Sequence, residues 1–167
     1  VFTIEEIIAI AAMTFGIGFI FSDYFRKPLD ENYDPLTHFG KRRSSVWENT
    51  KFAAMITAPP LVLHEFAHKF VAQAFGAIAI QNAPYTMYAI VIFLKMIGFP
   101  FLFFVGGYVS HTPLSPLPAA LVAVSGPATN FLIWGICLLL IKQRIVPRKY
   151  YKIVGPMGKI SLFLGIF

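Results

Sequence analysis

The sequence has few charged residues and few residues that could build a disulfide. Asp, Glu, Lys and Arg make up 13% of its 167 residues, whereas hydrophobic residues make up 57%. Soluble domains contain about 25% charged residues, so the composition excludes an ordinary soluble domain and indicates a membrane protein. The single cysteine, Cys137, excludes an internal disulfide and a metal cluster built on cysteines.

Basic residues outnumber acidic residues by 14 to 8. They flank hydrophobic segments, as in the cytoplasmic loops of membrane proteins, so we expect a lipid bilayer rather than nucleic acid as their partner. The length suits a single domain over residues 1–167. Because the chain begins with Val1 and ends inside an apolar run, we also expect that it is incomplete at its C-terminus.

Four apolar stretches approach the length of about 20 residues that a membrane-spanning helix needs. They are residues 4–21, 52–75, 88–108 and 118–141. A fifth apolar run begins near Ile160, and residues 22–51 form a polar connector. A signal peptide is the alternative for residues 4–21, but Glu5 and Glu6 stand where such a peptide has basic residues.

Helix-breaking or small residues occur in all four of these stretches. Pro59-Pro60 predicts a kink or a new helix start in the second stretch, and Gly126-Pro127 predicts a break in the fourth. Gly16 and Gly18 predict close helix packing in the first. Residues 95–100 split the third stretch into two halves too short to span a membrane.

The basic residues also predict a topology. Six lie in the connector: Arg26, Lys27, Lys41, Arg42, Arg43 and Lys51. Five follow the fourth stretch: Lys142, Arg144, Arg148, Lys149 and Lys152. The positive-inside rule places loops 22–51 and 142–152 on the cytoplasmic side, so an even number of crossings separates them. We therefore expect the third stretch to enter the membrane and return as a hairpin or strand pair.

Two lysines lie within apolar stretches. We expect Lys95 to extend toward the membrane interface rather than to gate a substrate. Lys69 is expected to reach a polar cavity.

The second stretch contains the motif His64-Glu65-Phe66-Ala67-His68. Residues four apart share one face of a helix, so His64 and His68 can bind one metal ion, and imidazole is a common zinc ligand. Zinc lowers the pKa of bound water to about 7, and Glu65 is placed to take its proton. The motif therefore predicts metal-dependent hydrolysis of a peptide bond. The alternative is a merely hydrogen-bonded polar cluster.

The fourth stretch contains "SGPATN", residues 125–130. Asn130 offers an amide that could bind a substrate backbone or stabilise an oxyanion. The alternative is an ordinary Gly-Pro kink with Asn130 bonded to a neighbouring helix.

Together, "HEFAH" and the later "SGPATN" resemble the site-2 protease family of intramembrane zinc metalloproteases, in particular its compact archaeal and bacterial members. The resemblance covers residues 52–141. It implies that His64 and His68 bind zinc, that Glu65 is the catalytic base and that Asn130 lies at the active site. It also implies membrane helices around the metal and a short membrane-dipping sheet after the zinc-binding helix.

One element of the family is absent. Its third zinc ligand is an aspartate in an Asp-Gly motif, and this sequence contains no Asp-Gly pair. The only aspartates are Asp23, Asp30 and Asp34, all in the connector. We therefore expect the third ligand beyond Phe167. His111 is a possible substitute, although a loop or interfacial position is expected for it, and the same holds for His38.

These patterns predict an α-helical polytopic protein of three to four transmembrane helices in the cell membrane, with a membrane-dipping hairpin or small sheet after the HEFAH helix. The predicted function is zinc-dependent cleavage of transmembrane segments in substrate proteins, whose unwound chain would add a strand beside the third stretch. The alternatives are a relative that binds membrane helices without cutting them, a metal transporter using the same histidines, and a membrane-anchored protease acting on soluble substrates.

Overall fold

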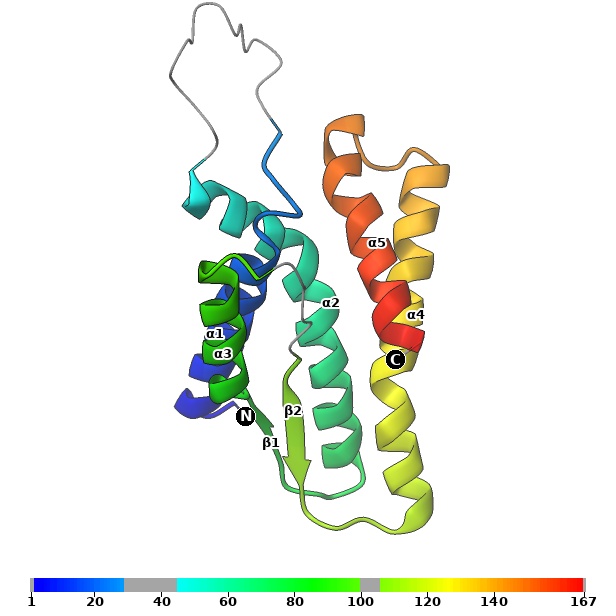
Figure 1. Ribbon diagram of the computed structural model, residues 1–167. Helices are drawn as coiled ribbons and strands as arrows, with labels where there is room; N and C mark the ends of the chain where they lie inside the picture. Colours follow the sequence, from blue (N-terminus) through cyan, green and yellow to red (C-terminus); the bar gives the residue numbers. More distant parts are fainter. Residues whose placement is uncertain (1, 29–44, 100–105, 167) are drawn as a thin grey trace, which may run out of the picture.

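The computed structural model describes residues 2–28, 45–99 and 106–166, which form helices and one small sheet (Figure 1). The elements in chain order are α1 (Ile4–Phe21), α2 (Val46–Ala74), β1 (Ala79–Asn82), α3 (Tyr85–Met96), β2 (Tyr108–His111), α4 (Pro116–Lys142), the 3-10 helix η1 (Arg148–Tyr150) and α5 (Tyr151–Ile166). The predicted first, second and fourth apolar stretches thus correspond to α1, α2 and α4.

Helix α2 lies at the centre of the molecule. It packs against α1 on one side and against α4 and α5 on the other, and it contacts both strands. Figure 1 shows α2 running antiparallel to α1 and to α4, and α5 turning back along α4. The residues of α2 are therefore the ones best placed to face several elements at once.

Two helices begin with side-chain caps that the sequence supplies. Thr3 and Glu6 form a capping box at α1, and Ser45 and Glu48 form another at α2. Each box satisfies backbone N–H groups that have no partner inside the helix.

The prolines interrupt the helices less than expected. α2 continues through Pro59 and Pro60, and its axis bends in its N-terminal half (Figure 1). α4 continues through Pro127, so the predicted break at Gly126-Pro127 is wrong. A proline removes one backbone donor and strains the turn before it, but the packing of both helices against their neighbours keeps them continuous.

Small residues bring α1 close to its neighbours, as predicted. A Cβ built on Gly18 would lie 2.7 Å from Cβ of Ala54, and one on Gly16 would lie 2.5 Å from the ring of Tyr88. These contacts border a buried apolar cluster between α1, α2 and α3 that includes Met13, Ile17 and Leu61, among others.

The third stretch forms a short structure that turns back. α3 is followed by β2, which pairs antiparallel with β1 in the register Ala79↔His111 to Asn82↔Tyr108. The small sheet expected after the HEFAH helix is therefore present. Lys95 does not extend away from the fold: it donates hydrogen bonds to Phe19 O and Ser22 Oγ at the C-terminal end of α1.

Two helices, α1 and α4, are long and apolar enough to cross a membrane. The C-terminal end of α1 and the N-terminal end of α2 lie at the same end of the molecule as the connection from α4 to α5 (Figure 1). The number of membrane crossings between them stays a prediction. The side of a membrane on which these loops lie stays a prediction.

Candidate metal centre

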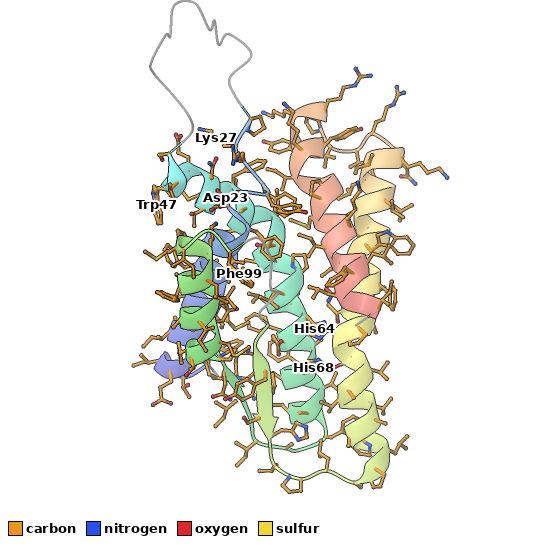
Figure 2. The ribbon with its side chains drawn as sticks, in the orientation of Figure 1. Asp23, Lys27, Trp47, His64, His68 and Phe99 are labelled. Carbon is orange, nitrogen blue, oxygen red and sulfur yellow. The ribbon has the colours of Figure 1, made fainter. Side chains whose placement is uncertain are left out.

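His64 and His68 lie one turn apart on α2, on the side that faces α4 (Figure 2). Their ring centroids are 4.8 Å apart and the ring planes are inclined by 74°. The structure thus brings together the two residues that the motif predicts as metal ligands. Neither Nε2 atom has a hydrogen-bond partner among the residues that the structure describes.

Both Nε2 atoms point at Gly126 of α4. A Cβ built on Gly126 would lie 2.5 Å from Nε2 of His64 and would also collide with Nε2 of His68. Real Cβ atoms do not tolerate such contacts, so only glycine fits here. The two nitrogens therefore lie close to the same point of the α4 backbone and close to each other, as two ligands of a single ion must.

The other nitrogen of His68 is held by α4. Nδ1 lies 2.6 Å from Val122 O and 3.4 Å from Ser125 Oγ, and Ser125 itself donates to Val122 O. A carbonyl oxygen can only accept a hydrogen bond, so Nδ1 carries the proton. In neutral imidazole this leaves a lone pair on Nε2, which is the tautomer that a metal ligand requires.

Asn130 holds the other nitrogen of His64. Its side chain is fully buried, and its amide nitrogen lies 2.8 Å from His64 Nδ1, while its Oδ1 has no partner among the described residues. A rotation of the amide by about 180° exchanges nitrogen and oxygen in place. Oδ1 then accepts the proton of Nδ1, and Nε2 of His64 is left with a lone pair for a metal.

Glu65 lies in the same cavity as the two histidines. The cavity has a volume of about 350 Å³ and is lined by His64, Glu65, His68, Gly107, Tyr108, Val109, His111, Ala119, Val122 and Ala123. Glu65 is buried, and a Cβ built on Gly106, just before β2, would lie 3.9 Å from its Oε1. A carboxylate beside two potential metal ligands can accept a proton from a water molecule in the cavity.

The two histidines fit zinc as part of a ligand set. Both present an unengaged Nε2, and both have the hydrogen-bonded Nδ1 that metal-bound histidines commonly have. Among residues 2–28, 45–99 and 106–166, no group of three or more His, Cys, Asp or Glu residues could hold a metal ion. A third ligand within this part of the chain is therefore not in place.

The other proposed ligands are distributed as follows. His111 lies on β2 and lines the cavity, rather than lying in a loop. Asp23 pairs with Lys95 at the far end of α1 and lies away from the histidines (Figure 2). Asp30, Asp34 and His38 lie outside the described residues.

Sequence reasoning missed three contacts of this site. Three residues of α4 contact the histidines directly: Val122, Ser125 and Gly126. The sequence patterns assigned only one residue of α4, Asn130, to the site. Val122 acts through its backbone oxygen, which no side-chain pattern can reveal. Gly126 was visible in "SGPATN", and its function is close approach of the backbone rather than a helix break.

Comparisons with known proteins identify no relative: no protein-family model, no curated protein and no solved structure matches this chain. The resemblance to the site-2 proteases therefore stays a prediction based on the two motifs.

Proposed function

We propose that this protein is an intramembrane zinc metalloprotease that cleaves peptide bonds within transmembrane segments of other proteins. The observation that supports it most strongly is the convergence of His64 and His68 Nε2 beside Gly126, with Glu65 in the same cavity. An isolated pair of partly buried histidines does not need a carboxylate beside it. Hydrolysis needs all three.

The membrane location is supported by the surface of α4. Only 17% of the most apolar part of α4 is buried, and its exposed side chains include Leu117, Val124, Leu132, Ile136 and Leu139. The core helix of a soluble protein is mostly buried, and water disfavours so large an apolar surface. A lipid environment removes this penalty.

The residues of the chain have separable roles in this proposal. A zinc ion would supply a Lewis acid and an acidified water. His64 and His68 would hold it, while Asn130 and Val122 orient the two imidazoles. Glu65 would take a proton from water and return it to the leaving amine.

The substrate would bind in extended form, because a helix hides its peptide bonds in its own hydrogen bonds. β2 pairs with β1 on one edge, and its residues Tyr108, Val109 and His111 line the cavity with Glu65. An unwound substrate segment could therefore pair with the other edge of β2 and bring a peptide bond to the cavity.

The test is Glu65→Gln, which removes the base but keeps the shape of the side chain. We expect purified E65Q in lipid vesicles to retain wild-type zinc content by elemental analysis and to lose cleavage of a reconstituted transmembrane substrate. A chelator should abolish wild-type cleavage, and added zinc should restore it. Full activity of E65Q would contradict the assigned role. Zinc flux into vesicles without cleavage by the wild type would instead indicate a transporter.

A further inference from the structure

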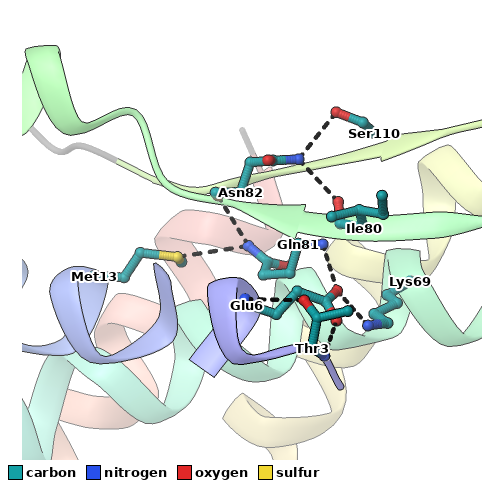
Figure 3. Close-up of polar contacts among 8 residues, drawn as sticks. All are labelled: Thr3, Glu6, Met13, Lys69, Ile80, Gln81, Asn82 and Ser110. Carbon is teal, nitrogen blue, oxygen red and sulfur yellow. Dashed lines mark hydrogen bonds and ion pairs between the residues drawn. The ribbon is translucent and has the colours of Figure 1, made fainter. Parts of the chain in front are cut away.

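A buried ion pair lies on a second face of α2. Glu6 of α1 and Lys69 of α2 are each 1% exposed, and Lys69 Nζ donates to Glu6 Oε1 (Figure 3). The ring of Phe2 covers the ammonium group, with its centroid 4.2 Å from Nζ. The sequence predicted that Lys69 would reach a polar cavity. Instead, Lys69 joins α2 to the start of α1 through Glu6.

Glu6 also holds the small sheet. Its Oε1 accepts a hydrogen bond from the backbone N–H of Gln81 on β1 at 2.7 Å, and its Oε2 accepts one from Thr3 N at 2.9 Å (Figure 3). Gln81 lies at the centre of β1 and is paired in register with Val109 of β2. One carboxylate therefore connects α1, α2 and β1.

The side chain of Gln81 in turn packs against Gly107. Its side-chain Nε2 packs so closely on Gly107 that a Cβ built there would lie 2.8 Å away, and it also contacts Met13 Sδ at 3.5 Å. Gly107 immediately precedes β2 and lines the same cavity as Glu65, and a Cβ built on the neighbouring Gly106 would lie 3.9 Å from Glu65 Oε1.

These contacts link α1, α2 and β1 to the residues that precede β2. Glu65 and Lys69 are four residues apart and share one face of α2. From Lys69 the contacts continue through Glu6 to Gln81, which lies close to Gly107, and Gly107 lines the same cavity as Glu65. The Glu6 carboxylate is therefore linked through Gln81 to the segment that lines the cavity with Glu65.

Stability alone is a poor explanation for this arrangement. Two charges lose their hydration when they are buried, and apolar replacements of both are often neutral or stabilising. A carboxylate, unlike an apolar residue, can accept the Gln81 N–H in a place that water does not reach. The Gln81 N–H needs a side-chain oxygen at position 6, and the charge that comes with the Glu6 carboxylate is compensated by Lys69.

We propose that Glu6 and Lys69 are positioning residues that hold β1 and the Gly107 amide against the catalytic carboxylate of Glu65. The inference rests on the proposed protease function. This buried ion pair lies outside the metal centre, so it should affect the turnover rate and not metal binding or substrate affinity.

Two matched double variants test this inference. Glu6→Gln with Lys69→Met removes both charges but keeps one side-chain oxygen, which can accept the Gln81 N–H, while the amide NH2 replaces the oxygen that accepts from Thr3 N. Glu6→Leu with Lys69→Met removes both charges and the acceptor. We expect E6Q/K69M to keep a kcat close to wild type and E6L/K69M to lose about 10–100-fold in kcat, because small displacements of catalytic groups have effects of this size. KM and zinc content should remain unchanged in both.

Amide hydrogen exchange measured by NMR supplies a readout without activity. The amides of Gln81 and Gly107 should stay protected in E6Q/K69M and lose protection in E6L/K69M. Thr3→Ala is the control for the helix start, because it weakens the α1 cap but leaves the acceptor of Gln81 in place. It should leave kcat and both amides unchanged.

The outcomes separate the two proposals. Equal kcat in an active wild type and both double variants would overturn the inference and leave the protease function intact. A wild type that does not cleave would overturn the protease function. In that case, different amide protection in the two double variants would still support the positioning of Gly107 by Glu6, and equal protection would overturn it.

Discussion

The polar side chains on the two faces of α2 differ in how many of their polar atoms have a partner. On the face toward α4, His64 and His68 have one nitrogen engaged and leave the other without a partner among the described residues. On the face toward α1 and β1, Lys69 is fully buried and paired with Glu6. The histidine nitrogens without a partner support the proposal that the first face binds a ligand, and the Glu6–Lys69 pair supports the proposal that the second face positions structure. Among the described residues, the buried Oε1 of Gln81, whose backbone N–H bonds to Glu6, also has no hydrogen-bond partner.

The largest expected effect is a loss of stability when the ion pair between Glu6 and Lys69 is broken. Lys69→Met leaves the Glu6 carboxylate buried without its partner, and loss of one member of a buried ion pair lowers stability by about 3–5 kcal/mol. The measurement is unfolding in detergent with increasing denaturant. E6Q/K69M should recover most of the loss. If the double variant is as unstable as the single one, the charge of Glu6 is not the cause.

Filling the space beside the histidines should come next. Gly126→Ala places a methyl group against both Nε2 atoms, so we expect a stability loss of about 1–3 kcal/mol from overpacking and a weakened zinc affinity. Gly135→Ala in the same helix is the matched control, because nothing lies within 4 Å of its built Cβ. Isothermal titration with zinc checks the prediction. Equal zinc affinity in the two variants would contradict the proposed position of the ion.

Removing an orienting contact should have a smaller effect on the same face. Asn130→Leu deprives His64 Nδ1 of its partner, and such losses lower metal affinity about 10–100-fold. Asn130→Asp keeps an oxygen acceptor and should bind zinc more tightly than Asn130→Leu. Competition with a fluorescent zinc chelator measures both variants. Equal affinities would indicate that Asn130 does not orient His64.

The smallest effect is expected far from both faces. Lys95 donates to backbone carbonyls at the C-terminal end of α1, where a positive charge also interacts favourably with the helix dipole. Lys95→Met should therefore lower stability by about 1 kcal/mol or less and leave zinc affinity unchanged. A change in zinc affinity would show that the end of α1 is coupled to the centre.

Much of the fold followed from hydrophobic length. The stretch 4–21 coincides with α1, and the residues around Lys95 do end α3, because polar and glycine residues interrupt a helix locally. Pro127 misled the prediction, because local propensity does not include the packing that keeps α4 continuous. The sequence indicates that Glu6 and Lys69, as charged residues in apolar segments, each need a partner, but it does not show that they pair with each other.

The sequence by itself determined which residues can do chemistry. The spacing of His64 and His68 places two imidazoles on one helical face, and Glu65 lies next to them wherever α2 packs. Tertiary structure alone decided which nitrogen is free, because Val122 and Asn130 reach the histidines only across the contact of α2 with α4. It also joined Glu6 to Lys69 and Gln81, which are 63 and 75 positions away. Side-chain contacts between distant segments depend on packing, and no local pattern records packing.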